Sequence, residues 1–141
     1  MDGLSQAHQV AERAKELGQD SIAICDHGSV SGCPSFVKEC KDKGIKPILG
    51  CELYVSNRDS GVKDSENRQL THLPILAKNL AGWQSLMKLV SESNKKDNYY
   101  YKPRLDLEKI AKYAGNFICF TGHPGTLLAN TFFKDYRAAY N

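Results

Sequence analysis

Histidines that follow short apolar segments are the residues of this sequence best suited to chemistry. His27 and His123 each come directly after such a segment, in a glycine-flanked stretch, and His72 begins another apolar run. Glycine lets the backbone turn tightly enough to direct a side chain across the edge of a sheet. Glu52 lies inside the apolar run GCELYV, where a carboxylate needs a partner because burying it alone is costly. These four residues are candidate ligands of a divalent zinc, manganese or iron ion.

The chemistry of such a site would be hydrolytic. Divalent ions held close together lower the pKa of a bridging water and bind both oxygens of a phosphoryl group during in-line displacement. The spacing of the four residues matches no short motif, so separate structural roles are the alternative. His8 falls within a predicted helix and is expected to be a solvated surface residue.

Alternating helices and strands must position these residues. Repeated βα units imply an α/β fold with a mostly parallel sheet and helices outside it. In such folds, polar residues just past the carboxyl ends of the strands gather into sites. Hydrophobic spacing and turn residues predict helices over 5–17, 34–44, 79–93, 106–115 and 126–141, and strands over 21–25, 45–55, 72–77 and 116–120.

The sequence predicts two long loops. Residues 56–71 are polar and aperiodic, and a loop of that length is usually functional or mobile. Residues 94–104 are basic and aromatic, and Tyr100, Lys102 and Arg104 are candidate nucleic-acid contacts, because tyrosines beside cations stack bases and bind phosphates. The alternative is a partly packed loop with solvated charges.

Composition sets the class of protein. The 141 residues predict one domain, and 25% charged with 41% hydrophobic residues is ordinary globular usage. No apolar run approaches the roughly 18 residues of a membrane span, and the first residues lack the pattern of a signal peptide. We therefore expect a cytoplasmic protein with no membrane partner. The five cysteines form no C-x-x-C pair and are expected to be mostly buried, reduced thiols.

The sequence lacks the glycine-rich motifs that bind nucleotide phosphates and the G-x-S-x-G motif that carries a serine nucleophile. Several ordered runs instead resemble the polymerase and histidinol phosphatase (PHP) domain of the bacterial replicative DNA polymerase III alpha subunit. The runs that carry this resemblance are IAICDHGSVSG, KGIKPILGCELYV, THLPILAKNLAGWQSLMKLVS and YYKPRLDLEKIAKYAGNFICFTGHPG.

The resemblance implies a partial PHP-type distorted (β/α)7 barrel spanning residues 1–141, with up to three metal ions at the carboxyl ends of its strands. Matched motif by motif, it implies the metal ligands Asp2, His27, Glu52, His72 and His123. His123 stands where polymerase members often have cysteine. Zinc or manganese is the expected cofactor, weakly bound in a fragment.

The family's first H-x-H pair and its last D-x-H motif have no counterpart in these residues. The resemblance therefore implies a fragment that lacks the first strand, the C-terminal part of the barrel and the polymerase active site, with weak or no 3′–5′ exonuclease activity alone. Its implied partners are DNA, the remainder of the polymerase alpha chain and a proofreading exonuclease subunit. The alternatives are a stand-alone PHP phosphoesterase and a non-catalytic module that binds a replication partner or DNA.

Overall fold

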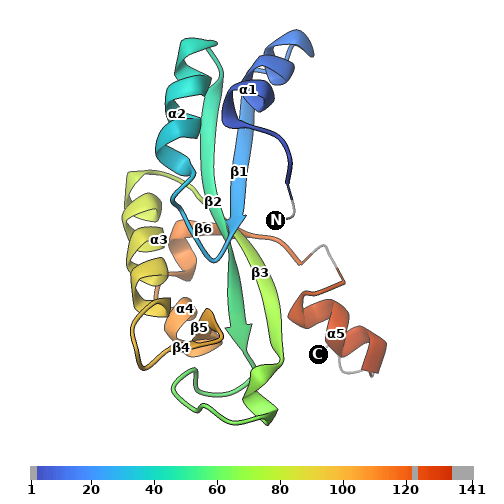
Figure 1. Cartoon of the computed structure of the whole chain (residues 1–141), viewed down its shortest axis with the longest axis vertical. Coiled ribbons are helices and arrows are strands. Elements are labelled where there is room, and N and C mark those ends of the chain that lie inside the picture. Colours follow the sequence, from blue (N-terminus) through green and yellow to red (C-terminus); the bar gives the residue numbers. More distant parts are fainter. Residues whose placement is uncertain (1–2, 122–123, 135–141) are drawn as a thin grey trace.

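A mixed sheet, with helices packed on it, forms the protein (Figure 1). A computed structural model covers the whole chain, and residues 3–121 and 124–134 are described. The helices are α1 (Ala7–Glu16), α2 (Cys33–Asp42), α3 (Leu80–Ser93), α4 (Leu107–Ala111) and α5 (Leu127–Lys134), with 3-10 turns at Glu66–Arg68 and Ala114–Asn116. The strands are β1 (Ser21–His27), β2 (Lys46–Ser56), β3 (Leu70–Ala77), β4 (Tyr99–Tyr100), β5 (Lys102–Asp106) and β6 (Phe117–Cys119).

Strand β2 organises the sheet. The first part of its 11 residues pairs in parallel with β1, and its end pairs in parallel with β5. Strand β3 runs antiparallel along the other side of β2 and is followed by β6. Helices α1 and α2 lie together at one end of β2, and α3 lies farther along it (Figure 1).

The expectation of a mostly parallel sheet is wrong for β3, β4 and β6, which enter antiparallel pairings. A parallel return requires a long crossover, usually a helix. The segment between β2 and β3 contains only one 3-10 turn, so the chain comes back antiparallel. The α/β class itself is confirmed.

Alternation along β2 separates the core from the site. Cys51, Leu53 and Val55 are buried and pack in one cluster with residues of α3, α4, β3, β5 and β6. Glu52 and Tyr54, between them, point to the opposite face because successive strand side chains alternate. A second cluster holds α1 and α2 against the sheet through Ala11, Ala14, Phe36, Cys40 and Ile45.

Two local predictions need correction, one about side-chain packing and one about secondary structure. Hydrophobic spacing predicts that Trp83, Leu86, Met87 and Val90 form the buried face of the helix that begins after Asn79. Met87 is instead 38% exposed, whereas Leu89 is buried. The helix begins as expected, with Asn79 accepting a hydrogen bond from the backbone N–H of Gly82. The 94–104 segment is not only a loop, because it contains β4 and the start of β5.

The five cysteines are free thiols, and Cys33, Cys40 and Cys51 are buried, which confirms that most of them act as small hydrophobic residues. Burial raises the pKa of Cys51 to about 12, so its thiol stays protonated at neutral pH. Within the described ranges, no helix has the length and apolar character needed to cross a membrane.

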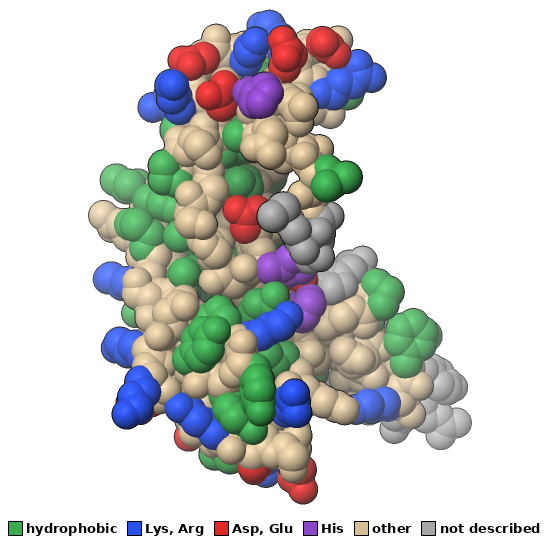
Figure 2. Space-filling model, viewed as in Figure 1, with side chains coloured by type: hydrophobic (Ala, Val, Ile, Leu, Met, Phe, Trp, Pro, Cys, Tyr) green, Lys and Arg blue, Asp and Glu red, His purple; other side chains and the backbone are tan. Residues whose placement is uncertain are grey.

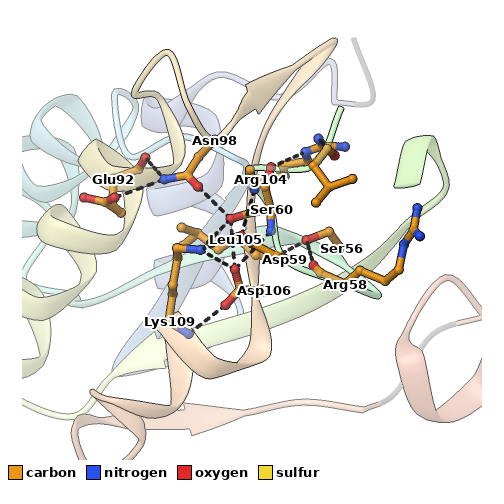
Figure 3. Close-up of polar contacts among 12 residues, drawn as sticks. Ser56, Arg58, Asp59, Ser60, Glu92, Asn98, Arg104, Leu105, Asp106 and Lys109 are labelled. Atoms are coloured by element: carbon orange, nitrogen blue, oxygen red, sulfur yellow. Dashed lines mark hydrogen bonds and ion pairs between the residues drawn. The ribbon is translucent and has the colours of Figure 1, made fainter. Parts of the chain in front are cut away.

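Arg104 fixes the polar segment between β2 and β3. Its side chain is fully buried, and its guanidinium donates hydrogen bonds to the backbone carbonyls of Ser60, Val62 and Asn67. Figure 3 shows this arginine among the polar contacts that join the segment to β5 and α4. These hydrogen bonds join the polar segment to β5.

Asp106 closes the same network (Figure 3). One carboxylate oxygen caps α4 by accepting from the N–H of Lys109, and the other accepts from the N–H and hydroxyl of Ser60 and pairs with the Lys109 ammonium. Burial by itself raises the pKa of this carboxyl, but the hydrogen bonds from Lys109 and Ser60 outweigh it and hold the pKa well below its usual value.

Asp106 should make the stability of the protein acid-sensitive. Because its folded pKa is depressed, its stabilising contribution is complete above the unfolded value of about 3.9 and is lost as pH falls through the lower folded value. Asp106→Asn keeps a capping side chain but removes the charge. Urea unfolding at pH 7 and pH 3 should therefore show a smaller pH-dependent loss for Asp106→Asn than for the wild type, whereas the exposed Asp97→Asn control should match the wild type. Equal losses in all three proteins would contradict this assignment.

Candidate metal centre

Strand register brings three of the predicted ligands together. His27 at the end of β1 lies opposite Glu52 on β2, and His72 on β3 lies opposite Tyr54. Residues directly opposite, and diagonal residues two positions along, share one face of a sheet. Side chains 20 to 45 positions apart in sequence thus meet on the face of β2 away from the core.

Glu52 lies between the two imidazoles. Its Oε1 is 2.5 Å from Nδ1 of His72, and its Oε2 is 3.5 Å from Nδ1 of His27. The Glu52 side chain is 13% exposed, and the histidine side chains are 26% and 37% exposed. The carboxylate is therefore largely withdrawn from solvent, while the imidazoles remain accessible from outside.

The neighbouring backbone and rings hold this arrangement in place. Strand β1 extends through His27, where a turn was predicted, and Gly28 follows with φ +61°, a value that glycine adopts without strain. The N–H of Gly28 donates to the carbonyl of Glu52. The ring of Tyr54 stacks on His27 at 6.1 Å between centroids and meets the edge of His72 at 5.1 Å.

The donor set fits one divalent cation. His27, Glu52 and His72 each offer a ligand atom, and these atoms lie within 4.8 Å of one another. Nitrogen and oxygen ligands bind zinc at about 2.0–2.2 Å, so ligand atoms of one ion lie within about 4.4 Å of each other. Small side-chain movements would bring all three into range, and two imidazoles with a carboxylate suit zinc, manganese or iron.

The other predicted ligands, Asp2 and His123, lie outside the described residues. The described chain beyond β6 does return to the site. The N–H of His72 donates to the carbonyl of Gly125, and His72 forms a parallel bridge with Thr126. His8 is exposed on α1, as expected.

The predicted nucleic-acid residues divide into two groups. Arg104 requires a correction, because its guanidinium is buried and engaged with three carbonyls, which leaves it no surface to offer a phosphate. Lys102 is exposed and Tyr100 is half-buried, and both line a pocket of about 330 Å³ next to His72. Arg68 and Tyr101 line this pocket too. Sequence reasoning missed Arg68, although its position in a polar loop of unusual length was a signal.

Comparisons with known proteins identify the family of the chain. A family profile described as the PHP domain matches residues 1–141. The chain is 41% identical over 123 residues to the DNA polymerase III subunit alpha of Treponema pallidum, covering 86% of this chain and 10% of that protein. It is 36% identical over 139 residues to the corresponding subunit of Borreliella burgdorferi, covering 94% of this chain and 12% of that protein. The chain thus spans about a tenth of the length of these curated relatives.

Among solved structures, an amidohydrolase from Chromobacterium violaceum aligns with a TM-score of 0.43 and 21% identity, covering 64% of this chain and 30% of that one. The match to the family profile extends over the whole chain. The chain therefore belongs to the PHP domain family.

Proposed function

We propose that this chain is the PHP part of a replicative DNA polymerase III alpha chain and that its site binds a divalent cation for phosphoester hydrolysis. The observation that carries the proposal is the convergence of His27, Glu52 and His72, whose ligand atoms lie within 4.8 Å of one another. Similarity to polymerase alpha subunits over most of the chain supports DNA as the substrate and the rest of a polymerase chain as the partner. Zinc or manganese as the ion, contact with a proofreading subunit and a cytoplasmic location are part of the same proposal.

The roles of the residues follow from their positions. A bound divalent ion supplies charge for a phosphoryl oxygen and acidifies a bound water. Glu52 would supply the carboxylate ligand, and its contacts with both imidazoles fix their orientation. The half-exposed imidazoles leave the ion open to substrate from the solvent side.

Hydrolysis by this chain alone should be weak. The described cluster supplies ligands for one ion, whereas clamping both the attacking and the leaving oxygen of an in-line displacement uses two. The expected 3′–5′ exonuclease activity is therefore low without further ligands. Asp2 and His123 stay proposed as such ligands.

Metal titration tests the proposal. Calorimetry with Zn²⁺ and with Mn²⁺ should show saturable binding of about one ion per chain, and His72→Ala should weaken it by at least about tenfold, the lower end of losses at metal sites. His8→Ala, which removes an exposed histidine on α1, is the matched control and should bind like the wild type. Equal affinity in the wild type and His72→Ala would overturn the site.

A second candidate function is a non-catalytic module that docks a replication partner. The observation that favours it is the exposure of apolar side chains on α5 and the adjoining end of β6, such as Phe120, Leu128 and Phe133. Metal binding without any metal-dependent cleavage of bis-p-nitrophenyl phosphate or of a labelled oligonucleotide would favour this module over the enzyme.

A further inference from the structure

The pocket beside His72 combines two cations with several aromatic rings. It has a volume of about 330 Å³, and its walls include Tyr54, Arg68, His72, Tyr101 and Lys102. Figure 2 shows histidines near the middle of the face, with basic and hydrophobic side chains beside them. The pocket is continuous with the candidate metal centre through the shared wall of His72 and the neighbouring Tyr54.

Both cations of the pocket are exposed and lie on aromatic faces. The Lys102 ammonium is 4.4 Å from the ring centroid of Tyr54 and donates to its hydroxyl, and the Arg68 guanidinium is 4.3 Å from the ring centroid of Tyr101. In the part of the chain that the structure describes, neither Arg68 nor Lys102 forms an ion pair with a carboxylate. Two uncompensated positive charges at one pocket attract an anion.

Tyr101 adopts a backbone conformation that tyrosine rarely takes. Its φ is +60°, which no other described residue except glycines shares. Such a conformation is strained in residues other than glycine and persists at sites where the surroundings enforce it. Here the hairpin of β4 and β5 places Tyr101 between them, and the ring is 62% exposed while contacting Arg68 and Tyr100.

The framework behind the pocket is rigid. Arg68 follows Asn67, which is buried and whose carbonyl accepts from the buried Arg104. Lys102 and Arg104 both belong to β5. The two cations therefore come from segments that Arg104 fastens together, which keeps their separation constant without a ligand.

We propose that this pocket holds a non-reacting phosphate of a single-stranded nucleic acid whose neighbouring phosphodiester lies at the metal centre. Arg68 and Lys102 bind the phosphate, and Tyr101 stacks a base, which is how cations and aromatic rings together hold single strands. This inference rests on the proposed function, because the proposed phosphoester hydrolysis is the reason for choosing a nucleic acid as the ligand. It adds Arg68 and Tyr101 as substrate-positioning residues and explains how the site would prefer a strand to a small phosphate ester.

Fluorescence anisotropy with a 5′-labelled twelve-residue oligo(dT) in EDTA tests the pocket without metal. Arg68→Ala and Lys102→Ala should each weaken binding, and the double variant should lower the slope of log affinity against log salt by about 0.7, the value for one phosphate contact on a single strand. Tyr101→Gly, which relieves the backbone strain, should weaken binding by about fivefold or more through lost stacking. Arg13→Ala and Lys41→Ala remove equal charge from exposed positions on α1 and α2 and serve as controls.

The outcomes separate this inference from the proposed function. If the three pocket variants bind oligo(dT) as the controls do, the inference is wrong even when metal binding is intact. If millimolar inorganic phosphate or p-nitrophenyl phosphate displaces the strand fully, the pocket takes a free phosphate and the inference is likewise wrong. If the pocket variants lose affinity while the wild type binds no metal, the inference stands and the proposed function fails.

Discussion

Glu52→Gln should reduce divalent metal affinity by more than about 100-fold, because even residues that only support metal ligands cost 10- to 100-fold when changed. The carboxylate oxygens of Glu52 lie close to Nδ1 of both imidazoles of the cluster. Glutamine keeps the size and one oxygen but loses the charge that a dication requires. Calorimetric titration with Mn²⁺ and Zn²⁺ measures the loss directly.

Thermal unfolding gives an independent reading of the Glu52 variant. A ligand present at 100 times its dissociation constant stabilises the folded state by about 2.7 kcal/mol. Metal should therefore raise the melting temperature of the wild type and of Glu12→Gln, an exposed carboxylate on α1, and leave Glu52→Gln unchanged. A metal-induced shift in Glu52→Gln as large as in the wild type would remove Glu52 from the site.

Arg104→Met should destabilise the protein by about 3–5 kcal/mol, the range measured when one partner of a buried charged interaction is removed. Three backbone carbonyls, at Ser60, Val62 and Asn67, would lose their donor, and each buried unpaired group costs about 1–3 kcal/mol. Methionine fills much of the space, so the expected loss reflects hydrogen bonding more than a cavity. Urea unfolding measures the free energy.

Arg58 supplies the matched control, since it is an exposed arginine of the same segment and pairs with Asp64 and Glu66. Arg58→Met should cost less than about 1 kcal/mol, as exposed ion pairs do. Arg104→Lys should fall between them, because an ammonium cannot reproduce the planar fork of a guanidinium. A loss below 1 kcal/mol for Arg104→Met would show that the segment does not depend on this arginine. In the folded Arg104→Lys variant, the oligo(dT) affinity should also fall, because Arg68 would lose its fixed position.

The candidate ligands could be recognised from sequence because each carries a local signal. Glu52 is a charged residue in an apolar strand, and His27 follows a predicted strand and precedes a glycine. Alternation along β2 also predicts which residues of this strand share a face, since the strand period does not depend on distant contacts. The sequence predicts a helix that begins at Asp106, and the structure confirms it, with the Asp106 side chain capping α4.

The burial of Arg104 could not be predicted in the same way. Its sequence neighbours, three tyrosines and a lysine, predict a basic aromatic surface, and Lys102 does line a pocket at the surface. Whether an arginine faces solvent or carbonyls depends on what lies across from it, and here that is a segment about 40 residues earlier.

The amino-acid sequence determined the PHP family, the types of candidate ligand and the strands that carry Glu52 and His72. Only the tertiary structure decided that β3 runs antiparallel, that Arg104 is buried and that Arg68 stands beside Lys102. The first group depends on residue type and on periodicities of a few positions, which a short stretch of chain contains. The second group depends on which backbone N–H and C=O groups of distant segments still need hydrogen-bond partners once the sheet has formed. A local sequence pattern contains no information about these groups.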